Sequence, residues 1–336
     1  MNGDRLSPLD VSFLHLEDES SHMHVASVML FDGEPPAYDD LIEMIESRLH
    51  LVPRYRQRLA FVPYSQGRPR WVDDPHLNLR YHVRVTALPK PGTEDQLRAL
   101  ASRVLSQQLD RDKPLWELWL IEGVEGDSFA VISKTHHALV DGISGVDIGT
   151  VLFDATPEPE AQAETGDRWL PRPAPGRAQL LAEALLERAT VPAEVGRTVR
   201  AIFRAPRQIA SAALEALEGV GAMAWAGLNS APPSPYNGPI GPHRRFTLVR
   251  ADLADLKAIK SELGGTLNDV VLATVTGGLR RHLDRRGIPV DDGLTLKAMV
   301  PVSVRADAER GALGNKVAAM MAPLPVGTGD AVARLG

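Results

Sequence analysis

The first half of the chain alternates short apolar runs with segments that repeat an apolar residue every three or four positions. The runs at residues 25–31, 115–123 and 129–137 are rich in β-branched and aromatic side chains, so they predict strands. Apolar residues at helical spacing predict helices at residues 38–51 and 97–108. This half therefore has the pattern of an α/β domain.

The second half has more helical spacing and fewer strand signals. Helical patterns cover residues 177–226, 253–263 and 268–286. Strands are predicted at residues 246–251, 294–302 and 316–323. Because this half has so few strands, we expect a separate polypeptide or a lost C-terminal segment to complete this second domain.

The length and two breaks in the pattern predict two domains. A chain of 336 residues exceeds what one hydrophobic core usually organises. Residues 156–175 are rich in Pro, Glu and Ala, and residues 229–242 are rich in Pro and Gly. We expect an N-terminal domain at 1–155, a proline-rich linker and helical crossover at 156–240, and the start of a C-terminal domain at 241–336.

The composition is that of a soluble globular protein, with 44% apolar and 24% charged residues. The chain has 37 basic and 43 acidic residues, and this net charge of −6 argues against a nucleic-acid partner. No apolar run is long enough to span a membrane and the first residues do not resemble a signal peptide, so a cytoplasmic protein is expected. The absence of cysteine excludes disulfides, thiolate metal sites and a cysteine nucleophile.

Two adjacent histidines in KTHHALVDG, at residues 134–142, are the clearest chemical signal. Successive strand side chains point to opposite faces, so we expect one of His136 and His137 to act and the other to pack. The same geometry argues against a metal site, and none is predicted. His137 lies nearer the tight turn expected at Asp141 and Gly142. The alternative is that both histidines are ordinary core or turn residues.

Several motifs resemble a known family. HHALVDG fits the HHxxxDG motif of the CoA-dependent acyltransferase superfamily, which includes condensation domains and chloramphenicol acetyltransferase-like enzymes. Seven further segments resemble the bacterial wax ester synthase/diacylglycerol acyltransferase family: LSPLDVSFLHLEDESSHMHVASVMLF, VPRYRQRL, PRWVDDPHLNLRYHVR, PLWELWLIEG, YNGPIGPHRRF, LNDVVLATV and VPVSVR. The resemblance implies a two-domain α/β (α+β) fold of the chloramphenicol acetyltransferase type, with an acyltransferase domain at 1–155.

The resemblance also implies an activity. Such enzymes transfer a long-chain acyl group from acyl-CoA to diacylglycerol, giving triacylglycerol, or to a fatty alcohol, giving a wax ester. Acyl-CoA is then a substrate, and no cofactor is expected. By resemblance, His137 is the general base, His136 supports it, Gly142 forms the turn, and Asp141 holds the loop with Arg305 as its candidate partner. The absence of cysteine and of a GxSxG motif agrees with direct transfer without an acyl-enzyme.

Two further family motifs shape the site by resemblance. Pro114, Leu115 and Trp116 match the PLW motif, and we expect them to form an apolar wall of the substrate tunnel. Asn268 and Asp269 match the ND motif at a predicted helix start, where either residue could also be an N-cap.

Two arginine clusters raise the question of anionic partners. Arg197, Arg200, Arg204 and Arg207 recur at helical spacing, which is typical of a basic amphipathic helix on a membrane or lipid-droplet surface. This predicts peripheral association with the inner membrane face or with lipid droplets; a plain solvated face is the alternative. A second cluster could meet CoA phosphates or simply face water: Arg280, Arg281, Arg285 and Arg286.

Two other functions remain open at this level. A condensation-type acyltransferase would use another acyl donor or acceptor. A non-catalytic or partial subunit would bind lipid or a partner without chemistry. The intact HHxxxDG motif argues against the second alternative, whereas a C-terminus shorter than is usual in the family argues for it.

Overall fold

The computed structural model of this protein describes residues 5–140, 169–187, 232, 234–303 and 317–335. The chain forms two compact units. The first comprises Met1–Val199, Ile240–Thr247 and Gly311–Asn315, and the rest of the chain makes the second. Both units mix helices with sheet, as predicted. Within the described ranges, no helix is long and apolar enough to cross a membrane.

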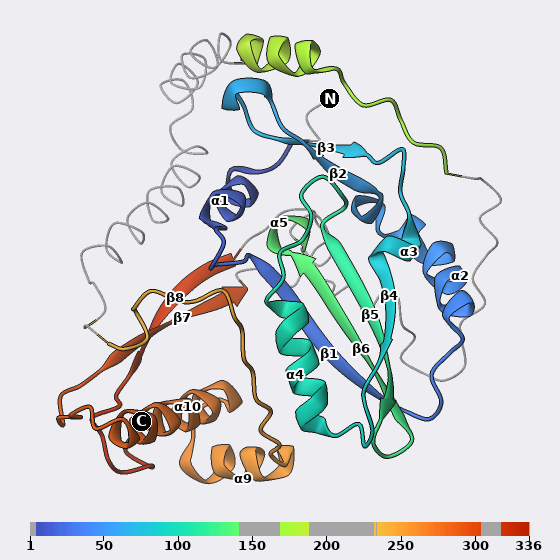
Figure 1. The fold of residues 1–336 in the computed structure, drawn as a ribbon. Helices are drawn as coiled ribbons and strands as arrows, with labels where there is room; N and C mark the ends of the chain where they lie inside the picture. The colour runs from blue at the N-terminus through green and yellow to red at the C-terminus, as the bar shows by residue number, and fades with distance from the viewer. Residues whose placement is uncertain (1–4, 141–168, 188–231, 233, 304–316, 336) are drawn as a thin grey trace, which may run out of the picture. The chain divides into compact units, whose positions relative to one another are not determined.

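A four-stranded sheet in the order β1-β6-β5-β4 is the centre of the first unit. Its strands are β1 (His24–Asp32), β4 (Val83–Ala87), β5 (Trp116–Val124) and β6 (Ser128–His136). β6 pairs antiparallel with both β1 and β5, whereas β4 and β5 are parallel (Figure 1). The predicted strands at 25–31, 115–123 and 129–137 all appear in this sheet, within a residue or two at each end.

Each face of this sheet packs against helices. On one face, Ile121, Ala130 and Ile132 pack with the apolar side of α4 (Glu94–Leu105). The alternate residues Leu118, Leu120 and Val131 belong to the larger core, because successive strand side chains point to opposite faces. That larger core also contains residues of α1 (Pro8–Leu16) and α2 (Tyr38–Arg48).

Shorter elements complete the first unit. β2 (Gln57–Ala60) and β3 (Arg70–Asp73) form an antiparallel pair. The remaining short helices are α3 (Leu79–His82), α5 (His137–Val140), η1 (Leu49–Leu51), η2 (Pro53–Arg56) and η3 (Pro63–Ser65). Residues 177–187 are helical, and ion pairs link this helix to the neighbourhood of β3, including Arg70 Nη1 to Glu183 Oε2 at 2.6 Å.

The second unit contains α9 (Leu253–Leu263), α10 (Leu267–Arg285), β7 (Leu296–Ser303) and β8 (Val317–Leu324). β7 and β8 pair antiparallel, and Leu283 of α10 packs with Leu296 and Leu324 of the two strands. The four predicted elements are confirmed within a few residues.

The strand predicted at 246–251 is wrong. These residues have no regular secondary structure, and Val249 is 88% exposed. None of the described strands pairs with this segment, so its alternating pattern has no sheet to join.

Candidate active site

The chain changes from strand to helix between the two histidines. β6 ends at His136 and α5 begins at His137. The His136 N–H donates to the Leu115 carbonyl at 2.9 Å, and the His137 N–H donates to the Met23 carbonyl at 2.8 Å. The prediction that the strand extends to His137 is therefore wrong by one residue. The reason is local, because His136 Nδ1 accepts the N–H of Ala138 at 3.0 Å and so caps the first turn of the new helix.

His137 lies half-buried against α1. Its ring stacks on the ring of Phe13, with centroids 4.2 Å apart and 28° between the planes. Nδ1 of His137 is buried and has no hydrogen-bond partner among the described residues, which leaves Nε2 as the nitrogen that can meet a substrate. Burial lowers the pKa of His137, so the ring is neutral near pH 7 and able to accept a proton.

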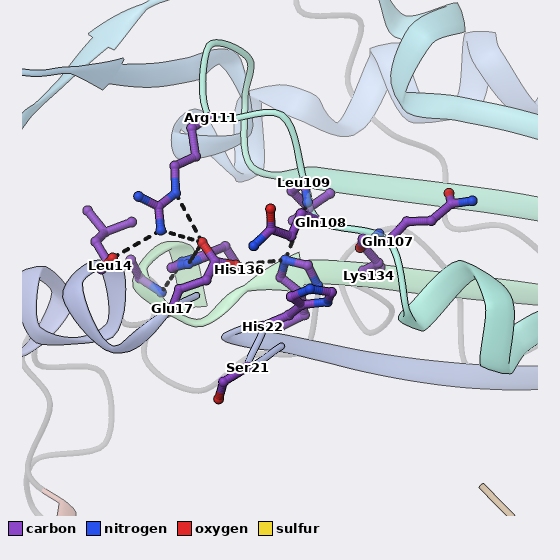
Figure 2. Close-up of polar contacts among 12 residues, drawn as sticks. Leu14, Glu17, Ser21, His22, Gln107, Gln108, Leu109, Arg111, Lys134 and His136 are labelled. Carbon is purple, nitrogen blue, oxygen red and sulfur yellow. Dashed lines mark hydrogen bonds and ion pairs between the residues drawn. The ribbon is translucent and has the colours of Figure 1, made fainter. Parts of the chain in front are cut away.

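His136 instead points into a buried polar cluster (Figure 2). Its side chain is 1% exposed, and its Nε2 lies 3.6 Å from Oε2 of Glu17. His24, which pairs with His136 across the β1–β6 ladder, places its Nε2 3.3 Å from Oε1 of Glu17. Arg111 donates from Nε and Nη2 to Glu17 Oε2 at 3.0 and 2.6 Å. The two adjacent histidines therefore have different surroundings, as the expectation of one acting and one packing residue requires.

The charge on Glu17 is strongly favoured. Burial alone would raise the pKa of its carboxyl, but contacts with His136, His24 and Arg111 outweigh burial and hold that pKa well below its ordinary value. Burial lowers the pKa of His24, partly opposed by Glu17. A carboxylate with one permanent cation and two imidazoles around it is thus buried beside β6.

A second buried charge lies on the same face of β6, two residues before His136. Lys134 is fully buried, and its Nζ donates to the carbonyls of Val104 and Gln107 at 3.1 and 2.7 Å. These carbonyls lie at the end of α4, where no later residue of the helix can satisfy them. Nζ also lies 3.6 Å from Oε2 of Glu117. Burial lowers the pKa of Lys134.

Pro114, Leu115 and Trp116 lie directly beside the end of β6. Leu115 and Trp116 are 0% and 1% exposed and belong to the larger core. The Trp116 indole N–H donates to the Tyr55 carbonyl at 2.9 Å, and its ring stacks on His82. The Leu115 carbonyl accepts the His136 N–H. The motif thus anchors the strand that carries the histidines, and its role as a tunnel wall stays a prediction.

The expectation that Asn268 or Asp269 is an N-cap is wrong. Thr266 is the N-cap of α10, and Asp269 is the third helical residue of a capping box. The Asp269 carboxylate accepts the Thr266 N–H at 2.7 Å, and this backbone bond and the Thr266 hydroxyl lower its pKa. Asn268 is exposed inside the first turn. Both residues lie in the second unit, and their site-shaping role stays a prediction.

The four arginines of the second basic cluster have different surroundings in the structure. Arg280 donates to the Val326 carbonyl at 2.8 Å and so holds the segment after β8. Arg281, Arg285 and Arg286 are exposed. Several predicted residues lie outside the described ranges: Asp141, Gly142, Arg197, Arg200, Arg204, Arg207 and Arg305.

Phe13, Glu17, His24 and Arg111 were not assigned roles from the sequence. One signal existed, because Ser7 and Asp10 form a capping box whose spacing is readable in LSPLD and predicts the start of α1. Phe13 and Glu17 are then four residues apart, the spacing that brings side chains to one side of a helix. Their contacts with His137 and His136 join residues about 120 positions apart, so no local sequence pattern reveals them.

Known proteins similar to this chain agree with its motifs. Residues 6–271 match the model of the wax ester synthase/diacylglycerol acyltransferase catalytic domain. A putative diacylglycerol O-acyltransferase of Mycobacterium tuberculosis H37Rv is 33% identical over 318 residues, which are 93% of this chain and 65% of that protein. The probable diacylglycerol O-acyltransferase tgs3 of the same strain is 36% identical over 264 residues, which are 76% of this chain and 95% of that protein.

A solved structure extends the likeness to the fold. The wax ester synthase/diacylglycerol acyltransferase of Marinobacter aquaeolei VT8 superposes with a TM-score of 0.62 at 28% identity, covering 98% of this chain and 69% of that one. The predicted fold class is confirmed. Together with the domain match over more than half of the chain, this shows that the chain belongs to the wax ester synthase/diacylglycerol acyltransferase family.

Proposed function

We propose that this chain transfers a long-chain acyl group from acyl-CoA to the hydroxyl of diacylglycerol or of a fatty alcohol. Family membership supports an acyltransferase. The relatives named above, a diacylglycerol O-acyltransferase and a wax ester synthase/diacylglycerol acyltransferase, support the acceptor class. The chain spans 65% of the length of one of these relatives, so the activity of the whole protein is part of the proposal. The observation that carries it is the half-buried His137 at the start of α5, stacked on Phe13 with a lowered pKa.

In this proposal, His137 is a general base and no acyl-enzyme forms. The imidazole takes the proton of the acceptor hydroxyl while the oxygen attacks the thioester carbonyl. The tetrahedral intermediate collapses to the ester and expels the CoA thiolate, which receives the proton from His137. Proton transfer of this kind typically contributes about 10² to 10⁴-fold to the rate, so binding and orientation must supply the remainder.

The environment of His137 suits this role. A base must be unprotonated before it acts, and burial of the ring favours its neutral form. Stacking on Phe13 limits rotation of the ring, which keeps the reactive nitrogen in one direction. Neither feature requires a metal or a nucleophilic side chain, and the chain contains no cysteine.

The proposal is tested by measuring CoA release from palmitoyl-CoA with a panel of acceptors. The panel contains diacylglycerol, hexadecanol and a short soluble alcohol, and each assay is run with and without any downstream polypeptide. We expect acceptor-dependent CoA release with a long-chain acceptor, matched by ester formation, and loss of both in His137→Ala. No acceptor-dependent release under any condition would contradict the proposal, and transfer only from a carrier-bound acyl group would indicate a condensation-type enzyme.

We further propose that the protein meets its lipid substrates at the inner membrane face or at lipid droplets. Long-chain acceptors partition into lipid, so an enzyme must collect them at an interface. The arginines at positions 197, 200, 204 and 207 are the sequence feature that supports docking there.

A further inference from the structure

We propose that Glu17 is a positioning residue for the acyl-transfer reaction, acting through His136 to fix the start of α5 and thereby the ring of His137. This inference rests on the proposed function of His137. Glu17 does not contact His137, and its effect is carried by the contacts that it makes with the preceding histidine (Figure 2).

The first step of the argument is the burial of Glu17. Its side chain is 3% exposed although it lies directly after the end of α1. A carboxylate at a helix end would ordinarily turn toward water, because burying a charge is costly. Here Oε2 faces Arg111 and His136 while Oε1 faces His24. The protein therefore commits one arginine and two strand histidines to one buried carboxylate.

The second step is the tautomer of His136, that is, which nitrogen of the neutral ring carries the proton. Its Nδ1 accepts the Ala138 N–H at 3.0 Å, so this nitrogen carries no proton. The proton of the neutral ring must then be on Nε2, which points toward Glu17 Oε2 at 3.6 Å. Nε2 makes no hydrogen bond among the described residues, so the attraction of its N–H to the Glu17 carboxylate is electrostatic. The carboxylate thus favours the one tautomer in which Nδ1 can cap α5.

The third step connects this cap to His137. The capped N–H belongs to Ala138, the residue that follows His137, and the His137 N–H is itself fixed to the Met23 carbonyl at 2.8 Å. The helix that ends before Glu17 also provides Phe13, on which His137 stacks. The helix α1 and the residue that follows it therefore contact both histidines, through a phenyl ring for His137 and a carboxylate for His136.

The test uses two substitutions and a matched control in the full chain. Glu17→Ala removes every contact, and Glu17→Gln keeps the shape while removing the charge. Asp73→Asn is the control, because Asp73 is also a buried carboxylate bound by an arginine, Arg172, and contacts neither histidine. All three variants lose a buried carboxylate. An effect that both Glu17 variants show and Asp73→Asn does not show therefore comes from the contacts of Glu17 with the histidines.

The first measurement is NMR of the histidine rings and does not depend on activity. The nitrogen shifts of His136 should show protonated Nε2 and bare Nδ1 in the wild-type protein, and the His137 ring protons should be shifted upfield by Phe13. In Glu17→Ala we expect the His136 tautomers to mix and the His137 upfield shift to collapse, whereas Asp73→Asn keeps both. If Glu17→Ala fails to fold, we expect Glu17→Gln to show smaller changes of the same kind in the His136 tautomers and in the His137 upfield shift. Wild-type His136 protonated on Nδ1, or unchanged rings in the folded Glu17 variants, would overturn the proposal.

The second measurement is kinetic. Glu17→Ala should lower kcat about 10²-fold, the effect of a small misplacement of a reacting group, with little change in KM for acyl-CoA. Glu17→Gln should lower kcat about tenfold, because a neutral amide attracts the Nε2–H of His136 less than a carboxylate does. In a His136→Asn background, the amide oxygen can replace Nδ1 as acceptor but the side chain cannot reach Glu17, so Glu17→Gln should have no further effect. Additive losses would reject action through His136.

The two measurements separate the two proposals. If the wild-type protein shows no acyl transfer, the proposed function fails, and the NMR result still decides whether Glu17 orders the two histidines. If transfer is normal and Glu17→Gln retains the wild-type kcat, the proposed function stands and the positioning role is rejected.

Discussion

The ring of Phe13 lies against the ring of His137, with centroids 4.2 Å apart and 28° between the ring planes. The contact joins the first helix of the chain to the residue that we propose as the base. It has two consequences, because it covers one face of the imidazole and restricts how the ring can turn. The first favours the neutral base, and the second favours a single direction of proton transfer.

Phe13→Ala tests the first consequence. Burial lowers the pKa of His137, so exposing the ring should raise this pKa toward its ordinary value near ~6.5. Transfer requires the neutral ring, and the rate therefore falls as pH drops through the pKa of His137. We expect the acid limb of the pH–kcat/KM profile to lie below about pH 6.5 in the wild-type protein and to move upward in Phe13→Ala. Phe13→Leu keeps most of the burial and should move the limb less; an unmoved limb in both variants would contradict this account.

Substitution of each histidine should separate proton transfer by His137 from the support that His136 gives to the fold and to the site. His137→Ala should lower kcat/KM by about 10² to 10⁴-fold with unchanged circular dichroism. His136→Ala removes the acceptor of the Ala138 N–H and one of the three groups around Glu17, and should lower the free energy of unfolding by about 1 to 3 kcal/mol, measured by urea denaturation. The assignment fails if folded His137→Ala protein keeps near wild-type turnover.

Much of this architecture was readable from the sequence, and the reasons are local. The helices α4 and α10 follow a period of 3.6 residues, because each presents one side to a core. The strands β5 and β6 are short apolar runs instead, because both of their faces are buried. The segment at 246–251 shows the limit, since a strand needs a neighbour and its own pattern does not supply one.

The polar network around His136 was less accessible to sequence reasoning. Glu17, His24 and Arg111 are brought together by the sheet and by the loop after α4, and a buried ion cluster leaves no period in the sequence. The strand end was predicted one residue late because a side chain, His136, caps the helix that follows it. The secondary-structure propensities of single residues do not reveal a contact between a side chain and a helix end.

Lys134 gives a prediction about stability. Its Nζ donates to two carbonyls at the end of α4. Lys134→Met would keep most of the packing but remove this donor from both carbonyls, although the Val104 carbonyl keeps the Gln107 N–H at 3.3 Å. We expect a loss of about 1 to 3 kcal/mol in the free energy of unfolding, seen as a lower urea midpoint. Lys260→Met is the control, because Lys260 is exposed and should change stability by less than about 0.5 kcal/mol. Equal effects of the two substitutions would show that the buried contacts contribute little.

Docking to lipid is the last prediction, and it concerns residues outside those that the structure describes. Each Lys or Arg near an anionic surface contributes about 1 kcal/mol, so four arginines at helical spacing can support reversible binding when apolar side chains also enter the interface. Changing Arg197, Arg200, Arg204 and Arg207 together to Gln should weaken co-sedimentation with anionic vesicles. It should also raise the apparent KM for lipid acceptors, while activity on a short soluble alcohol is retained.

A matched charge removal distinguishes docking from a general effect of net charge. Arg281 and Arg285 of α10 are exposed, as is Arg286 directly after it. Changing these three to Gln removes a similar charge elsewhere in the chain. We expect this control to bind vesicles nearly as the wild-type protein does, whereas the quadruple variant binds weakly at every salt concentration. Raising salt to ~1 M should weaken wild-type binding, because the Debye length falls to about 3 Å. Equal sedimentation of the quadruple variant and the wild-type protein at low and high salt would show that these arginines do not carry the docking.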